Sequence, residues 1–259
     1  VRSEFELNSN FTNFLNFPTA GDQIQQKEDR NTWGFNSSRS WFGNFNNREM
    51  ENTVGFQTRY DNVNPISLSR TQGGVPMAKL DSNGNLQPST VRRDILNEYN
   101  ISFYAENRMQ WSPWFRSVIG VRNDFYHFDV DSNLEANSGK KSDNMTSPKL
   151  AFVFGPWSKT EFYLNGGGGF HSNDARGITK RVDPNAPTIA TRRATPLVRT
   201  WGYEVGFRTG IVPGLQTTVS IWQLHVDSEL LFVGDAGSTV ASRPSLRRGI
   251  EFTNYWRPV

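Results

Sequence analysis

Two stretches of alternating residues, joined by a short turn at residues 155–158, constrain the fold of this chain most. Before the turn, Leu150, Phe152 and Phe154 occupy every second position, and the same spacing recurs after it. Alternation with a period of two is typical of a β-strand whose two faces have different surroundings. The second stretch then leads into a polar loop at residues 171–196. A short turn at one end and a long loop at the other is the layout of an outer-membrane β-barrel.

The same rhythm continues along the chain, because long polar connections alternate with short turns. A soluble β-sandwich would not keep every second connection to a few residues. The alternation loses phase near Gln223, which predicts a bulge there. We predict ten strands, at about residues 2–17, 28–42, 49–60, 99–111, 115–125, 149–154, 161–170, 201–208, 215–221 and 249–256. The long loops are expected at residues 18–27, 61–92, 129–146, 171–196 and 234–245.

The low hydropathy of the chain would by itself indicate a soluble protein, but that inference does not hold for barrels. Only 36% of residues are hydrophobic and the mean hydropathy is −0.61, but half of each barrel strand faces a polar lumen, so low hydropathy does not exclude a barrel. No apolar run approaches the roughly 18 residues of a membrane helix. Five tryptophans lie at or near the short turns, where a periplasmic aromatic girdle is expected. These are Trp41, Trp111, Trp114, Trp157 and Trp256.

The predicted fold class is therefore all-β, an antiparallel transmembrane β-barrel fragment of about ten strands with short periplasmic turns and long extracellular loops. The chain has no cysteine, which excludes disulfides, thiolate chemistry and cysteine zinc sites. Its net charge of +3 is small for 259 residues, so we expect no nucleic-acid partner.

Several stretches resemble the β-barrel domain of TonB-dependent outer-membrane receptors. The strongest match is SPKL leading to GFHSNDARG, and others are SNFTNFL followed by GDQ, GVRNDFY, SELLFVGDAGS and SLRRGIEFTNYWRP. The resemblance covers most of the chain. It implies a cell outer-membrane receptor that takes up a scarce nutrient such as a siderophore–iron complex, cobalamin or a glycan. The implied partners are outer-membrane lipid, a plug domain, the TonB system and the nutrient, with no cofactor.

The chain departs from such receptors in its extent. Transporters of this kind have about 22 strands and a plugged lumen, whereas ten strands are predicted here. The plug domain and an aromatic residue that closes the barrel at the carboxyl terminus are not found in this sequence. We therefore expect residues 1–259 to be part of a receptor barrel domain.

The best candidates for contact with a ligand are His171, Asn173, Asp174 and Arg176. They lie where a strand becomes a long outer loop, which is where the resemblance implies that a substrate is recognised. The alternative for these residues is packing at the loop tip and contact with lipid headgroups.

A second polar group is predicted to face the lumen. Both signs of charge occur in it, which disfavours a simple ion-selectivity filter, and mutual pairing or contact with a plug explains the group better. Its members are Glu106, Arg108, Arg122, Asp124, Glu204 and Arg208.

Two other motifs lack parts that their chemistry requires. Residues 166–169 are four glycines, but the Lys-Ser/Thr of a phosphate loop does not follow them; glycines within a strand more often mark close approach of another backbone. Residues 129–135 alternate oxygen ligands, but Leu134 replaces the glycine and Lys140 the final glutamate of an EF-hand. We interpret that segment as a solvated acidic tip and predict no metal site.

Histidine catalysis is also disfavoured. His127 with Asp124 and Asp129 would form an acid–base pair, but interfacial polar residues at a strand end are the better interpretation. A nucleophile elbow is absent from the sequence, so we predict no catalytic residue. Two other functions stay open: a self-contained ten-stranded outer-membrane barrel enzyme, such as a protease, and a passive porin.

Overall fold

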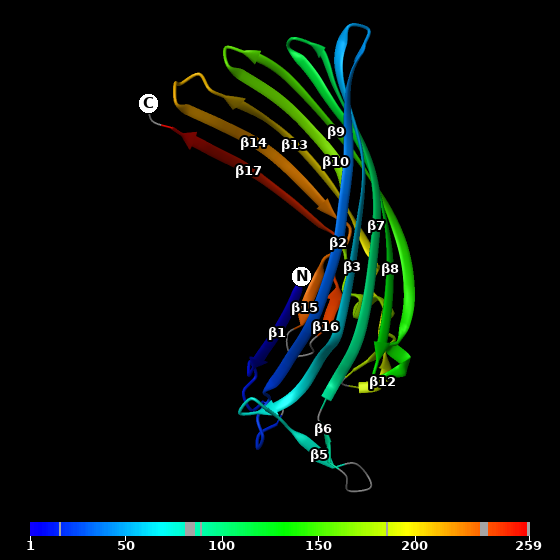
Figure 1. Ribbon diagram of the computed structural model, residues 1–259. Helices are drawn as coiled ribbons and strands as arrows, with labels where there is room; N and C mark the ends of the chain where they lie inside the picture. The colour runs from blue at the N-terminus through cyan, green and yellow to red at the C-terminus, as the bar shows by residue number, and fades with distance from the viewer. Residues whose placement is uncertain (16, 81–85, 89, 185, 234–237, 258–259) are drawn as a thin grey trace.

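A computed structural model describes residues 1–15, 17–80, 86–88, 90–184, 186–233 and 238–257. In these residues, ten long strands form one antiparallel sheet in which each strand pairs with the next long strand in sequence. The strands are β1 (Arg2–Ser9), β2 (Ile24–Phe45), β3 (Arg48–Gln72), β7 (Thr90–Ser112), β8 (Phe115–Ser132), β9 (Gly139–Trp157), β10 (Thr160–Ser172), β13 (Leu197–Thr209), β14 (Leu215–Val226) and β17 (Ser245–Trp256). The sheet curves without closing (Figure 1). The predicted fold class, an antiparallel barrel fragment of about ten strands, is confirmed.

Shorter elements gather at the loop end of the sheet, the lower end in Figure 1. They are β4 (Val75–Pro76), β5 (Ala78–Leu80), β6 (Leu86–Pro88), the 3₁₀ helix η1 (Glu135–Asn137), α1 (Ala175–Thr179), β11 (Val182–Asp183), β12 (Ala186–Ala190), β15 (Leu230–Val233) and β16 (Ser238–Ala241). Within the described residues, no helix has the length and apolar character to cross a membrane.

Tight turns connect the strands at the opposite end. Asn46 and Asn47 have φ of 49° and 59°, and Ser158 and Lys159 have φ of 47° and 61°. Two consecutive residues in the left-handed region give a hairpin turn whose twist matches that of the flanking strands. The turn predicted at residues 155–158 is therefore displaced, because β9 continues to Trp157.

The strands extend farther toward the loops than predicted. Much of residues 61–92 belongs to β3 and β7, and the loop expected at residues 129–146 shortens to residues 133–138. Beyond the apolar band the outer face becomes polar while the inner face keeps buried apolar residues such as Val63 and Leu96, so the simple pattern of apolar-out and polar-in is lost although the hydrogen-bonded ladder continues. Tyr60 Oη, for example, donates to Asn97 Oδ1 at 2.7 Å across this ladder.

Two other boundaries were also wrong. The first strand ends at Ser9 rather than near residue 17, and β2 begins at Ile24, inside the loop predicted at residues 18–27. The bulge predicted near Gln223 is absent, since β14 pairs residue by residue with β17 from Leu215 to Val226.

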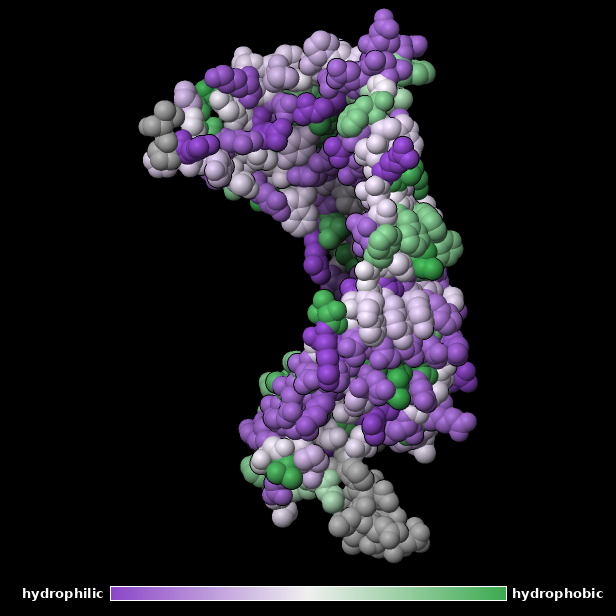
Figure 2. All heavy atoms as spheres, viewed as in Figure 1, coloured by the Kyte–Doolittle hydropathy of each residue, from purple (hydrophilic) through white to green (hydrophobic). Residues whose placement is uncertain are grey.

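The two faces of the sheet differ. On the outer face, Ile101, Phe103 and Val121 are 43%, 54% and 47% exposed. Two sets of aromatic side chains bound this apolar band, as aromatic girdles bound the band of a membrane barrel. Near the turns, Trp114 lies 6.3 Å from Trp157 between ring centroids. Figure 2 shows a green apolar patch at mid-height above a mainly hydrophilic lower part.

The second aromatic set is a cross-strand row near the loop end. It consists of Trp33, Tyr60, Tyr99 and His127, one residue from each of β2, β3, β7 and β8, with successive centroids 5.4, 4.5 and 6.2 Å apart. We refer to these four residues as the outer aromatic row.

The hydrophobic core lies on the other face, here called the inner face, against α1. Phe128 is fully buried there, and strand residues surround Ala175 and Ile178 of α1. The core comprises Val63, Leu96, Phe128, Val130, Met145, Ala175, Ile178 and Leu197. This packing fixes the loop between β10 and β13 onto the inner face at the loop end of the sheet.

Candidate ligand-binding site

A polar cavity of about 300 Å³ lies on the inner face, between the strands and the start of the β10–β13 loop. Its lining contains carboxylates, guanidinium groups and a few apolar side chains. The lining residues are Glu28, Arg30, Arg59, Asp61, Val63, Ile66, Leu96, Glu98, Asn100, Tyr126, Ser172, Asn173, Asp174, Ala175 and Arg176.

Asp61 organises the charges on the strand side of the cavity. Its carboxylate accepts from Arg59 Nε at 2.6 Å and from Thr32 Oγ1 at 2.7 Å. Arg30 lies 3.4 Å from the same carboxylate and 2.6 Å from Glu28. Acidic partners thus hold the guanidinium groups of Arg30 and Arg59 in place. The cavity therefore contains both positively and negatively charged groups.

The loop side of the cavity is formed by the first turn of α1. Asp174 Oδ1 accepts from the backbone N–H of Arg176 at 2.8 Å, and the two side chains form an ion pair at 2.5 Å. Burial raises the pKa of Asp174, but the Arg176 guanidinium and the hydrogen bonds outweigh it, so that the pKa lies below its usual value. Asp174 is therefore ionised at neutral pH and caps the helix.

Asn173 connects this turn to the far end of the loop. Its backbone N–H donates to Pro196 O at 2.9 Å and its Nδ2 to Thr195 O at 2.6 Å. The side chain is buried, and its Oδ1 has no hydrogen-bond partner. Asn173 thus presents a buried acceptor beside the cavity.

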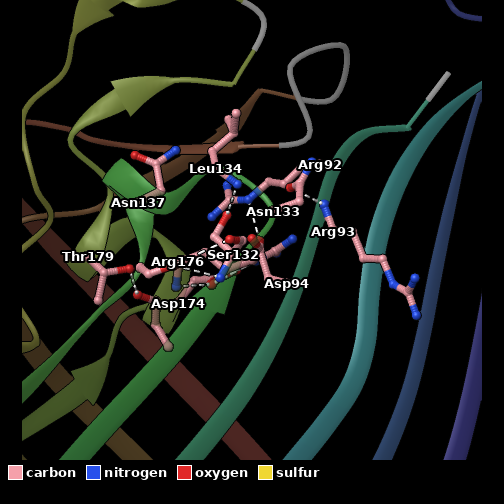
Figure 3. A network of polar contacts seen from close by, with 12 residues as sticks. Arg92, Arg93, Asp94, Ser132, Asn133, Leu134, Asn137, Asp174, Arg176 and Thr179 are labelled. Carbon is pink, nitrogen blue, oxygen red and sulfur yellow. Dashed lines mark hydrogen bonds and ion pairs between the residues drawn. The ribbon is translucent and has the colours of Figure 1, made fainter. Parts of the chain in front are cut away.

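A buried charge pair lies under the loop (Figure 3). Arg92 and Asp94 of β7 are hydrogen-bonded to each other and are 3% and 0% exposed. Arg92 Nη2 and Asp94 Oδ1 are buried without a partner, and the charges of Asp174 and Arg176 act on the pair. The loop therefore covers an incompletely satisfied ion pair.

Asn137 anchors the next part of the loop. Its Oδ1 accepts from the backbone N–H groups of Arg181 and Val182 at 2.8 and 3.0 Å, and its Nδ2 donates to Val182 O at 3.2 Å. The side chain is fully buried. One amide thus supplies hydrogen-bond partners to three backbone groups in the middle part of this loop.

Three of the four residues predicted to contact a ligand meet at this cavity, namely Asn173, Asp174 and Arg176. His171 lies on β10 opposite Val198 and is not among the lining residues. Ligand contact by all four stays a prediction.

Sequence reasoning missed the strand side of the cavity. Arg59 and Asp61 had been placed at the end of a strand and the start of a loop, and Glu98 just before a strand. The signal was the continuing period of two through Arg59, Asp61 and Val63, which share one face although only Val63 is apolar.

The six charges predicted to face the lumen lie on the inner face and are paired with neighbours there. Arg108 and Lys149 hold Glu106 at 2.8 and 3.3 Å. Arg122 binds Asp124 at 2.8 Å, and Arg208 binds Glu161 at 2.5 Å. Glu204 Oε2 accepts from Asn165 Nδ2 at 3.1 Å.

The motifs set aside on sequence grounds have structural roles. Residues 166–169 lie inside β10, paired with β13. Asp129 is ion-paired with Lys140 at 2.9 Å, and no cluster of three potential metal-ligating side chains occurs in the described part of the chain. His127 bonds Ser142 at 2.8 Å on the outer face, whereas Asp124 is buried on the inner face, so the acid–base pair does not form.

Comparisons with known proteins agree with the observed fold. The chain matches the family described as "TonB dependent receptor-like, beta-barrel" over residues 2–257. A search of the curated proteins returned no match. Among solved structures it is similar to BauA, the ferric preacinetobactin receptor from Acinetobacter baumannii, with a TM-score of 0.69 and 14% identity, covering 100% of this chain and 39% of that one.

Two other solved structures have comparable similarity. The copper transporter OprC gives a TM-score of 0.65 at 16% identity, covering 100% of this chain and 40% of that one. The ferric citrate transporter FecA in the unliganded form gives 0.64 at 12% identity, covering 90% and 33%. The chain thus spans between a third and two fifths of the lengths of these proteins.

Proposed function

The chain belongs to the β-barrel family of TonB-dependent receptors, and on this basis we propose that it forms part of the wall of a receptor that binds a scarce nutrient at the cell surface and admits it through TonB-energised uptake. The family is located in the outer membrane, and its solved neighbours here are transport receptors. The nutrient, the plug domain and the coupling to TonB belong to the proposal, as does the absence of enzymatic activity.

The observation that carries this proposal is the inner-face cavity. Charged side chains of β2, β3 and β7 line the cavity together with the start of the β10–β13 loop. The hydrophobic core and the Asn137 amide hold this loop in position. A preformed polar cavity at the loop end of a barrel wall can take part in binding a polar ligand without ordering the loop first. Binding of this kind requires no covalent chemistry.

We propose an iron complex as the first ligand class to test, because BauA and FecA are named for ferric ligands. The cavity offers Arg30, Arg59 and Arg176 as donors to the acidic groups of a siderophore. The copper transporter OprC makes a copper complex the second class.

The test is binding of ferric siderophores by the purified full-length receptor, monitored by intrinsic tryptophan fluorescence. The panel contains ferric citrate, a catecholate and a hydroxamate complex, together with cobalamin and a copper salt. We expect at least one metal complex to bind, and Arg59→Gln to weaken it about tenfold through loss of a charge-assisted hydrogen bond. Arg193→Gln is the control, since Arg193 is exposed and lies outside the cavity. Equal affinities of the Arg59→Gln and Arg193→Gln variants would show that the cavity does not bind the ligand.

A further inference from the structure

β10 presents its even-numbered side chains to different faces of the sheet at its two ends. Phe162 and Leu164, near the turn, are 48% and 46% exposed on the outer face. Beyond the glycines at residues 166–169, Phe170 packs against the core of the inner face and Ser172 lines the cavity there. Pairing with β13 continues without a register shift along the whole of β10, so a bulge does not cause the change. The β10–β13 hairpin therefore turns over at the four glycines.

Pro148 of β9 marks the point at which β10 leaves β9. The β9–β10 ladder ends at the pair Lys149–Gly167, although β9 itself extends back to Gly139. A proline has no N–H to donate to a neighbouring strand. A Cβ on Gly167 would lie 3.0 Å from Pro148 O, and one on Gly168 would lie 3.1 Å from Pro148 Cδ. Glycine at these two positions therefore lets β10 turn closely past Pro148.

The turned-over end of the hairpin forms a lid on the inner face. We call residues 170–184 and 186–199 the lid. Ile178 and Leu197 of the lid belong to the hydrophobic core. Because β10 has left β9, the edge of β9 beside it is unpaired: within the described residues, the strand partner of residues 139–147 is β8 alone.

The position of the lid combines stabilising and destabilising contributions. Burial of its apolar side chains and the hydrogen bonds of Asn137 stabilise it. Against these, Arg92 Nη2 and Asp94 Oδ1 are buried under the lid without a hydrogen-bond partner (Figure 3), which costs free energy. The unpaired edge of β9 is a second unfavourable feature, because it leaves a strand available for pairing. Opposing contributions of this kind are typical of elements that have two arrangements.

We propose that the lid moves as a folded unit about Gly166–Gly169, between the closed position of the structure and an open position in which β10 continues its ladder with β9. Extending the register from the pair Lys149–Gly167 places Ser172 opposite Asn144 and gives the edge of β9 a partner. The same movement exposes the covered ion pair to water and withdraws the loop side of the cavity. The lid thus controls access to the cavity, whichever ligand the cavity binds.

A disulfide can report the open position, because the chain has no cysteine of its own. In the closed position Ser172 lines the cavity on the inner face. Asn144 lies on the outer face, where its register partner Phe125 is 50% exposed. Cysteines at residues 144 and 172 are therefore on opposite faces of the sheet when the lid is closed, and they can join only when it opens.

The experiment is oxidation of the full-length Asn144→Cys/Ser172→Cys receptor in lipid vesicles with copper phenanthroline, followed by mass spectrometry of non-reduced tryptic peptides. Phe152→Cys/Leu164→Cys is the control, since these residues are register partners below the glycines and stay paired in both positions. We expect both disulfides to form, the control disulfide faster.

Two further changes should move the rate of the 144–172 disulfide in opposite directions. Ile178→Ala weakens the packing of the closed lid and should speed oxidation about tenfold. Replacing the covered pair by Arg92→Met and Asp94→Leu removes a penalty of the closed position and should slow oxidation about tenfold. No 144–172 disulfide under conditions that fully oxidise the control would overturn the proposal, and so would faster oxidation in both backgrounds.

Hydrogen exchange of the cysteine-free Ile178→Ala receptor distinguishes movement of a folded lid from its unfolding. Re-pairing of β10 with β9 should protect amides within residues 140–147 relative to the wild type while α1 exchanges faster. Faster exchange of α1 without added protection on β9 would mean that the lid unfolds, which would also overturn the proposal. Heat-modifiable migration on gels confirms that each variant is folded before these measurements.

Discussion

The ring of Tyr104 lies directly over Gly55, its register partner across the β3–β7 pair. A Cβ atom on Gly55 would overlap the phenol ring. The same relationship recurs in Tyr163 over Gly206 and Trp222 over Gly249, where a Cβ would lie 2.5 Å from Tyr163 Oη and 2.6 Å from Trp222 Cζ2. Each aromatic ring occupies the space beside the glycine opposite it, which helps to fix the register of the strands.

The first prediction concerns this contact. Gly55→Ala should destabilise the folded receptor by about 1–3 kcal/mol, because the added methyl group displaces the Tyr104 ring. In a Tyr104→Ala background the same change should cost much less, since the three atoms nearest to the added Cβ all belong to Tyr104. Urea unfolding of the full-length receptor in lipid vesicles measures both values.

Gly210→Ala is the control, because no atom lies within 4 Å of a Cβ at that glycine. A loss of stability for Gly55→Ala that persists undiminished without the Tyr104 ring would refute the contact as the cause.

The second prediction concerns the two faces. Val121→Arg places a charge on the outer face and should cost roughly 2–4 kcal/mol near mid-bilayer depth. Asn165→Arg lies at a similar distance from its turn on the inner face, where Asn165 already bonds Glu204 at 3.1 Å, so its cost should be far smaller. Urea unfolding in vesicles compares the two, and equal costs would contradict the assignment of the faces.

Much of the fold could be predicted because lipid-facing strands keep a strict period of two. Ile101, Phe103 and Val121 carried that signal, and the ten strands follow from it. The strand ends could not be predicted in the same way. In β3 the outer face becomes polar beyond Tyr60, and hydrogen bonds such as Asn62 Nδ2 to Asn97 Oδ1 at 2.9 Å hold the ladder there. Such pairing depends on register across 35 residues of sequence.

The candidate site was predictable only on its loop side. Asn173, Asp174 and Arg176 are close in sequence, so their grouping was visible in the chain. Arg59 and Glu98 reach the cavity only because β3 and β7 pair side by side and α1 folds onto them. A single sequence does not show which loop packs on which strand.

The third prediction tests how the loop is held. Asn137→Ala removes the acceptor of the Arg181 and Val182 N–H groups and should cost about 1–3 kcal/mol of loop stability. Limited trypsin digestion of the folded receptor should then cleave faster at the loop residue Arg193. Asn144→Ala, at an exposed position on β9, should digest like the wild type. Equal cleavage rates for the two variants would show that Asn137 does not hold the loop.

The fourth prediction is a dependence on pH. Because Arg176 holds the folded-state pKa of Asp174 below its usual value, the ionised carboxylate stabilises α1 fully above the usual carboxyl pKa. This stabilisation is lost as the pH falls through the folded-state pKa. Hydrogen exchange of α1, corrected for the intrinsic rate at each pH, should therefore increase on acidification.

Asp174→Asn keeps a capping side chain without a titratable group, so most of this pH dependence should disappear in the variant. An unchanged profile would mean that other groups control opening of the loop.

The most direct test of the proposed receptor function is uptake of a radioactive ferric complex by cells that depend on the full-length receptor for it. The complex is the one that binds most tightly in the fluorescence panel. We predict uptake with the wild type, uptake reduced about tenfold at subsaturating ligand by Arg59→Gln, and none when TonB is deleted. Uptake that persists without TonB would contradict energised transport and favour a passive pore, and tight binding with no uptake at all would contradict the transport function itself.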